Sequence, residues 1–242
     1  KYLNFRGLNL SIESLDGLIK HNGPVNNLTK LDNQIGIDNF KNKINFNYYP
    51  SLEAQISAVS DDVAYNNHDI LDGIKSKIFK FDSLLEINFF KEIHKKYSKR
   101  KQNILIYQII RDSIDLMVQD LIANTIKNIK KYKIKKIKDI YKNKTKIVCF
   151  SERFVQIENE IKNLLKTKMY KNKYVLEKND NGKKIIKKLF KIIEKKPNKF
   201  IEKEEIKVDK YRAIADYIAG MTDRYAINLY NKVKWTFIKL QN

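Results

Sequence analysis

Helical spacing of apolar residues runs through most of this 242-residue chain and constrains its fold more than any other feature. After Tyr48-Tyr49-Pro50, Ser51 stands where an N-cap belongs and Glu53 in the first turn of a helix expected over 52–75. No run shows the sustained alternation of a half-buried strand. We expect further helices at about 83–98, 102–131, 152–168, 183–195 and 209–231. The sequence predicts an all-α fold.

Glycine, proline and asparagine mark the predicted breaks between helices. An amphipathic helix with Leu15, Leu18 and Ile19 ends before Gly23-Pro24. The asparagine-rich stretch 24–50 is expected to be a loop with a short helix inside it. We predict a turn at Asn179-Asp180-Asn181-Gly182 and a break between two helices at Pro197.

The formal net charge of +21 comes from 49 lysines and arginines against 28 acidic residues, and most of the basic residues are lysines. Residues spelled by A- and T-rich codons dominate, so codon drift explains much of this charge; a basic binding face is the alternative. Protein surfaces that bind phosphate groups use arginine as well as lysine, and arginine is scarce in this chain. The lysine-rich stretch 127–146 has the same two interpretations, a helix with a solvated lysine face, which we favour, or a polyanion-binding patch.

A single cysteine, Cys149, excludes an internal disulfide and fits a reducing compartment. The longest apolar runs, such as 104–110, fall far short of the ~20 residues that a membrane helix needs. The sequence starts at Lys1, without a signal or transit peptide. We therefore expect a cytoplasmic protein with no membrane partner.

The segment 51–69 contains the first candidate site. At about 100° per residue, Asp61, Tyr65 and Asp69 form one stripe of a helix, with His68 close to its edge. Two carboxylates, a phenol and an imidazole would suit a divalent cation or a polar substrate. The alternative is an ordinary solvated acidic face. Small residues on the same helix would let neighbouring helices approach closely: Ala54, Ala58 and Ala64.

Two other segments carry charged residues near helix ends or breaks. Arg212 and Asp216 are spaced as an intrahelical ion pair, and Gly220, placed inside a helix, suggests close packing or close approach of a ligand. Lys20 and His21 stand at a predicted helix C-terminus, where they would either meet phosphates or complement the helix dipole.

Taken in order, these segments resemble the deoxyguanosinetriphosphate triphosphohydrolase-like proteins of the HD-domain phosphohydrolase superfamily. The matching stretches are GLNLSIESLDGLIKHNGP at 7–24, SLEAQISAVSDDVAYNNHDILDGI at 51–74 and RAIADYIAGMTDRYA at 212–226. Weaker matches, LLKTKMY at 164–170 and KKLFKIIEKKPNKF at 187–200, look like the family's linking helices. The resemblance covers residues 7 to 231. It implies a C-terminal portion of the HD-domain helical fold, with residues 1–75 completing the HD domain and 76–242 forming a helical C-terminal region.

The resemblance also implies a reaction, in which a deoxynucleoside triphosphate and water give a deoxynucleoside and triphosphate. Family members bind a divalent metal, Mg²⁺ or Mn²⁺, through His…His-Asp…Asp, and the last Asp matches Asp61. Tyr65 and Asp69 match residues that meet the deoxyribose and its 3′-hydroxyl. Lys20 matches a phosphate-contacting lysine, and Tyr217 an aromatic residue near the nucleoside.

The chain departs from the family pattern in its metal ligands, because the first His and the His-Asp pair lie upstream of the matching segments. The only histidines are His21, His68 and His94, and His68-Asp69 belongs to the Asp61 helix. A lone aspartate cannot hold a metal at useful affinity. We therefore expect no complete catalytic set, weak metal retention, and inactivity unless a companion chain supplies the missing ligands. We also expect exposed apolar helix faces and association, including a homo-oligomer. The alternative function is a non-catalytic basic module that binds nucleic acid or other polyanions.

Overall fold

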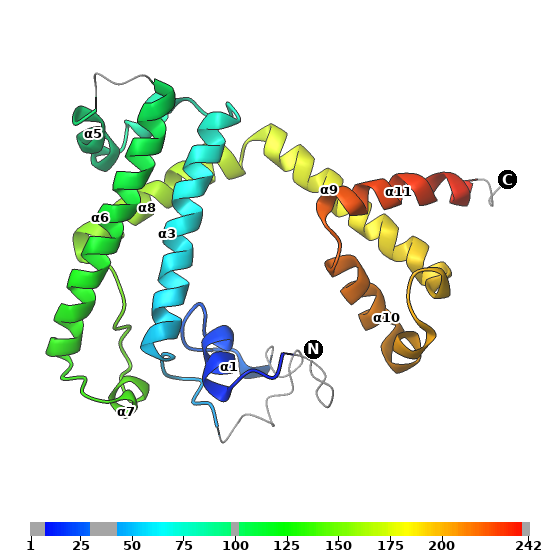
Figure 1. The fold of residues 1–242 in the computed structure, drawn as a ribbon, viewed down its shortest axis with the longest axis horizontal. Helices are drawn as coiled ribbons and strands as arrows, with labels where there is room; N and C mark the ends of the chain where they lie inside the picture. The colour runs from blue at the N-terminus through cyan, green and yellow to red at the C-terminus, as the bar shows by residue number, and fades with distance from the viewer. Residues whose placement is uncertain (1–7, 30–42, 98–101, 239–242) are drawn as a thin grey trace. The chain divides into compact units, whose positions relative to one another are not determined.

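The computed structural model of the protein describes residues 8–29, 43–97 and 102–238 (Figure 1). Every regular element in these ranges is a helix, which confirms the all-α prediction. The chain folds as two compact units, residues 1–169 and residues 170–242. The domain boundary expected at residue 75 coincides with the end of the Asp61 helix and not with the division between these two compact units. It stays a prediction.

Two long helices form the frame of the first unit. The helix α3 (Leu52–Lys75) begins after Ser51, whose Oγ accepts a hydrogen bond from the Ala54 amide at 3.3 Å. The helix α6 (Gln102–Lys131) runs antiparallel beside it (Figure 1). Both helices have the bounds that the sequence predicts. The other helices of this unit are α1 (Ile12–Ile19), α4 (Phe81–Leu84), α5 (Asn88–Lys95), α7 (Ile137–Tyr141) and α8 (Glu152–Leu164). A π-helical stretch, Leu165–Tyr170, follows α8 and ends at the first residue of the second unit.

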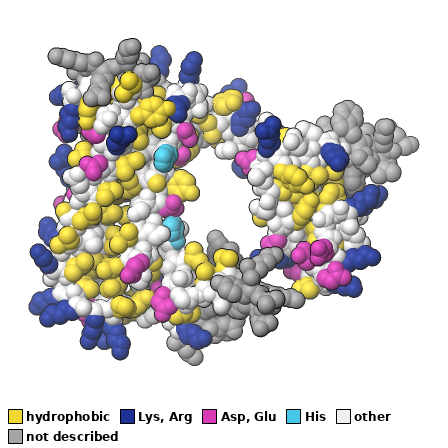
Figure 2. Space-filling view, viewed as in Figure 1, with side chains coloured by type: hydrophobic (Ala, Val, Ile, Leu, Met, Phe, Trp, Pro, Cys, Tyr) yellow, Lys and Arg dark blue, Asp and Glu magenta, His cyan; other side chains and the backbone are white. Residues whose placement is uncertain are grey.

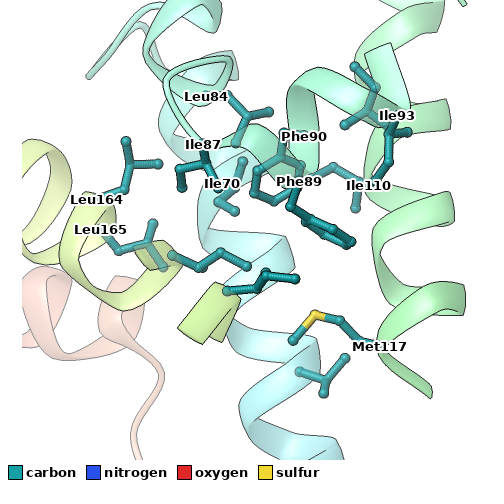
Figure 3. Close-up of a cluster of buried hydrophobic side chains, with 14 of the residues drawn as sticks. Ile70, Leu84, Ile87, Phe89, Phe90, Ile93, Ile110, Met117, Leu164 and Leu165 are labelled. Atoms are coloured by element: carbon teal, nitrogen blue, oxygen red, sulfur yellow. The ribbon is translucent and has the colours of Figure 1, made fainter. Parts of the chain in front are cut away.

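The main apolar core of this unit joins α3, α5, α6 and α8 (Figure 3). Ile70, Phe90 and Ile109 are completely buried, one from each of α3, α5 and α6. Burying a side chain of this size stabilises the fold by about 1.5–3 kcal/mol relative to leaving it exposed. The core therefore fixes the rotation of α3, and the polar stripe of that helix faces away from it.

The first helix packs unusually closely on α3. A Cβ built on Gly17 of α1 would lie 2.8 Å from the Cβ of Ala54, so only glycine fits at this crossing. The sequence predicted a close approach at the small residues of α3, and Ala54 confirms it. This contact brings the C-terminus of α1 to the polar face of α3.

Two expected helices of the first unit have different limits. The helix expected at 83–98 is two short helices, α4 and α5, within the described residues. The lysine-rich stretch is not one helix, because α6 ends at Lys131, Lys133 adopts a left-handed conformation (φ 51°) and α7 begins only at Ile137. The short helix expected inside 24–50 stays a prediction, because residues 30–42 of that stretch lie outside the described residues.

In the second unit, α9 (Lys173–Lys195) corrects one prediction of the sequence. The turn predicted at residues 179–182 is wrong, because α9 continues straight through it. Residues 179–182 are exposed, whereas Leu189 and Ile193, further along the same helix, are buried in the core of this unit. The break at Pro197 is confirmed, since a short 3-10 turn, Pro197–Lys199, follows α9.

Gly220 also differs from its predicted place. The helix expected over 209–231 is divided into α10 (Lys203–Ala219) and α11 (Asp223–Ile238), with Gly220 at the C-cap of α10. A Cβ there would meet no protein atom closer than 3.6 Å, so close packing does not require glycine at this position, and the close approach of a ligand stays a prediction. The Arg212–Asp216 pair is confirmed, with Nε 2.9 Å from the carboxylate.

Exposed apolar side chains lie along one stripe of α6, which the exposed Arg111 and Asp115 interrupt. Its exposed side chains include Ile104, Tyr107, Val118, Ile122 and Ile126. Figure 2 shows hydrophobic surface over α3 and α6 in this region. Exposed apolar faces were expected, and the association they favour stays a prediction. Among the helices of the described ranges, none has both the length and the apolar character needed to cross a membrane.

Candidate functional site

The polar face of α3 carries three of the predicted site residues in one stripe. Asp61 and Tyr65 are exposed, Asp69 is half-buried, and His68 is exposed at the edge of the stripe. Tyr65 keeps 64% of its surface exposed, so it does not serve the apolar core. Figure 2 shows histidine side chains next to acidic ones over α3. The structure therefore gathers the hydroxyl, carboxylate and imidazole groups that the helical spacing predicted.

The C-terminus of α1 lies against this stripe. Nε2 of His21 is 3.8 Å from Oδ2 of Asp61, and both side chains are about half exposed. Lys20, the preceding residue, is the C-cap of α1 and only 2% exposed. Its Nζ forms an ion pair with Asp16, which is also buried. Burial raises the pKa of Asp16 above its usual value, and the neighbouring Lys20 opposes that rise.

A second ionic contact holds α8 against α3. Nζ of Lys162 lies 3.4 Å from Oδ2 of Asp62 and 2.9 Å from Oε1 of Glu158. Burial alone would lower the pKa of Lys162, but the hydrogen bonds and charges of Glu158 and Asp62 raise it. The carboxylate next to Asp61 is therefore already paired with a cation, whereas Asp61 faces His21.

Between α1 and α3 lies a small pocket, which we call the α1–α3 pocket. Its volume is about 270 Å³. It opens beside the Asp61 stripe, because Asp62 and His21 are both part of its wall. The lining residues that matter here are Lys20, His21, Tyr49, Gln55, Asp62 and Lys146.

Gln55 holds two walls of this pocket together and was not singled out in the sequence. Its Nε2 donates to the carbonyl of Pro50 at 2.8 Å. Its Oε1 accepts from the backbone amides of Ile147 at 3.0 Å and Val148 at 3.1 Å. Gln55 is 2% exposed, so these bonds satisfy an otherwise buried amide group.

Two residues that the sequence left unassigned thus belong to the site, Gln55 and Lys146. The signal for Gln55 was present, because it is a polar residue one turn before Val59 on the apolar side of the helix. A polar group at such a position must find a hydrogen-bonding partner. Lys146 had no comparable signal, since it is one lysine among many in its stretch.

The described residues do not by themselves form a metal site. Nowhere in the ranges 8–29, 43–97 and 102–238 do three or more His, Cys, Asp or Glu side chains gather in a way that could hold a metal ion. Asp61 has the exposed carboxylate of a ligand, and His21 is the nearest imidazole to it. A divalent cation therefore fits Asp61 as one ligand of a set whose other members these residues do not provide.

Tyr217 lies in the second unit, on α10, and is half-buried against its core. Its ring is 6.3 Å from that of Phe200, measured between centroids. Burial raises the pKa of Tyr217, and a hydrogen bond with Tyr225 raises it further. Its predicted contact with a nucleoside stays a prediction.

Comparison with known proteins yields two kinds of match. Residues 148–232 match the model of the phosphohydrolase-associated domain. A deoxyguanosinetriphosphate triphosphohydrolase-like protein of Pelagibacter ubique (strain HTCC1062) is 59% identical over 233 residues, which cover 95% of this chain and 63% of the relative.

Proteins of the same name in two other bacteria are more distant. The one from Rickettsia bellii (strain RML369-C) is 36% identical over 243 residues, 96% of this chain and 63% of its own length. The one from Bartonella henselae is 34% identical over 244 residues, 95% of this chain and 61% of its own length. The chain thus spans less than two thirds of the length of these curated relatives.

Proposed function

Because this chain is homologous to the deoxyguanosinetriphosphate triphosphohydrolase-like proteins across 95% of its length, we propose that it is the C-terminal portion of a hydrolase of deoxynucleoside triphosphates. The overall reaction would be attack of water on the phosphoryl group next to the sugar. The bond between that phosphorus and the 5′-oxygen breaks, the 5′-oxygen takes a proton, and triphosphate leaves with the oxygen of water. The observation that supports this proposal most is the Asp61 stripe beside a cationic pocket.

The side chains of α3 would bind and orient the sugar. The carboxylate of Asp69 accepts a hydrogen bond from the 3′-hydroxyl, and the exposed ring of Tyr65 packs one turn earlier against the deoxyribose. Packing of the Tyr65 ring against C2′ would disfavour a ribonucleotide, because the 2′-hydroxyl would be buried without space or a hydrogen-bonding partner.

Side chains at the C-terminus of α1 would then face the phosphates. Lys20 and His21 line the α1–α3 pocket, and His21 is close to the Asp61 carboxylate. A fixed ammonium such as that of Lys20 stabilises negative charge that develops on the leaving group. The buried pair with Asp16 holds the Lys20 ammonium in one position.

Asp61 would be one ligand of a divalent cation, Mg²⁺ or Mn²⁺, which polarises a phosphoryl oxygen when bound. We propose that a His and a His-Asp pair from a companion segment complete the ligand set, and that this chain is inactive without them. The part of the Pelagibacter relative that lies outside the match would be a source of that segment.

The test is release of triphosphate from dGTP with Mn²⁺ present, by this chain alone and mixed with the unmatched segment of the Pelagibacter relative. We expect turnover in the mixture and none from either component. Turnover by the chain alone would contradict the need for added ligands. A mixture that forms a complex but releases no triphosphate would contradict the proposed hydrolase function.

A second candidate function is supported by the lysine-rich stretch 127–146. Every lysine in it except Lys146 is exposed, as a polyanion-binding face requires. Binding of this kind releases counterions, so affinity for single-stranded DNA would fall steeply with salt concentration. The affinity for DNA would be the same in the variant Asp61→Ala as in the wild type. DNA binding that is absent, or insensitive to salt, would exclude this function.

A further inference from the structure

We infer that Lys146 binds the phosphate chain of the nucleotide in the α1–α3 pocket and that Gln55 positions it there. Lys146 is the one lysine of the stretch 127–146 that is not exposed, and its side chain lines this pocket. The inference rests on the proposed function only for the identity of the ligand as a nucleotide. The site itself rests on charge and geometry.

The charge balance of the pocket favours an anionic ligand. Among its charged side chains, Lys20 is paired with Asp16 and Asp62 is paired with Lys162. Lys146 forms no ion pair with any side chain of the described residues. A half-buried ammonium without a counter-ion gains from an anion that brings its own negative charge. The pocket therefore offers one uncompensated cation next to His21.

Four hydrogen bonds hold the backbone that carries Lys146. Gln55 accepts from the amides of Ile147 and Val148. From α6, Nδ2 of Asn128 donates to the Ile147 carbonyl at 2.9 Å, and Nδ2 of Asn124 donates to the Cys149 carbonyl at 2.8 Å. The backbone next to Lys146 is thus fixed to both long helices, so a ligand has only the Lys146 side chain to order.

The size of the pocket identifies which part of a nucleotide it holds. A volume of about 270 Å³ is just below the ~300–1,000 Å³ of pockets that enclose whole small molecules. Phosphate groups fit this space, and the sugar would remain outside, beside Tyr65 and Asp69. A cationic pocket next to the stripe that would bind the sugar is the arrangement that a deoxynucleoside triphosphate requires.

The experiment measures binding of inorganic triphosphate to the full chain by isothermal titration calorimetry. Lys146→Gln should weaken affinity about tenfold, as expected for loss of one charge-assisted hydrogen bond. Lys146→Arg, which keeps the charge, should retain most of the affinity. Gln55→Met should weaken binding as well, and the double variant should be no weaker than Lys146→Gln alone, because Gln55 acts through Lys146.

The matched control is Lys144→Gln, which removes the same charge two residues away from an exposed side chain that does not line the pocket. Equal weakening by Lys144→Gln and Lys146→Gln would overturn the inference, and so would the absence of triphosphate binding to the wild-type chain. If triphosphate binds in a Lys146-dependent way but no mixture hydrolyses dGTP, the inference stands and the proposed hydrolase function fails.

Discussion

Replacing Gln55 by methionine tests the part of the structure that assembles the pocket. Methionine keeps the volume of the side chain but removes its three hydrogen bonds to Pro50, Ile147 and Val148. The two amides belong to residues that are 0% and 1% exposed. A buried N–H group left without an acceptor costs about 1–3 kcal/mol, so two cost about 2–6 kcal/mol. Because water in the pocket can reach one side of this position, we expect a loss at the low end, about 2–3 kcal/mol.

The loss would be measured as the free energy of unfolding in urea, followed by circular dichroism, together with amide hydrogen exchange. Peptides that contain residues 146–149 should exchange about 30- to 140-fold faster, since 1.4 kcal/mol corresponds to a factor of ten. The control is Gln119→Met, because this exposed glutamine makes one surface hydrogen bond, to Asp115, and should change stability by less than about 0.5 kcal/mol. If Gln55→Met unfolds within 0.5 kcal/mol of wild type and leaves exchange at residues 146–149 unchanged, the bonds do not hold this segment.

Three further substitutions test packing and buried charge. Gly73→Ala should destabilise the protein by about 1–3 kcal/mol in thermal unfolding, because its Cβ would clash with the ring of Phe79. Gly182→Ala should stabilise it by about 0.5–1 kcal/mol, since a Cβ there meets no atom within 4 Å inside α9; a loss of stability would show that α9 does not continue there. Lys20→Met should cost about 3–5 kcal/mol at pH 7 by leaving Asp16 buried without a cation. Since burial raises the pKa of Asp16, the carboxyl is protonated as the pH falls through that raised pKa, and part of the loss should be regained; a loss independent of pH would contradict this.

Local features of the sequence predicted the scaffold of the site. Ser51 is a strong N-cap and the apolar spacing after it continues to Lys75, so α3 and the stripe of Asp61 on it follow from short-range rules. The turn predicted at 179–182 is wrong because tertiary packing outweighs the local preference of these residues. Its turn-forming residues are exposed, and burial of Leu189 and Ile193 further along α9 outweighs their local preference.

The pocket could not be predicted because its contacts join distant parts of the chain. The bond from the Ile147 amide to Gln55 links residues 92 positions apart. A polar side chain on the apolar side of α3 indicates that a partner exists, but helical spacing does not identify it. The inward placement of Lys146 depends on that partner, so one lysine among many could not be selected from the sequence.

The measurement that tests the central claim most directly compares two aspartates of α3 in the complemented hydrolysis assay. Asp61 is the proposed metal ligand, whereas Asp72 is an exposed aspartate near the end of the same helix. Triphosphate release from dGTP should be abolished by Asp61→Asn and unchanged by Asp72→Asn. If the Asp61→Asn mixture hydrolyses dGTP at the wild-type rate, Asp61 is not a metal ligand and the proposed role of α3 is wrong.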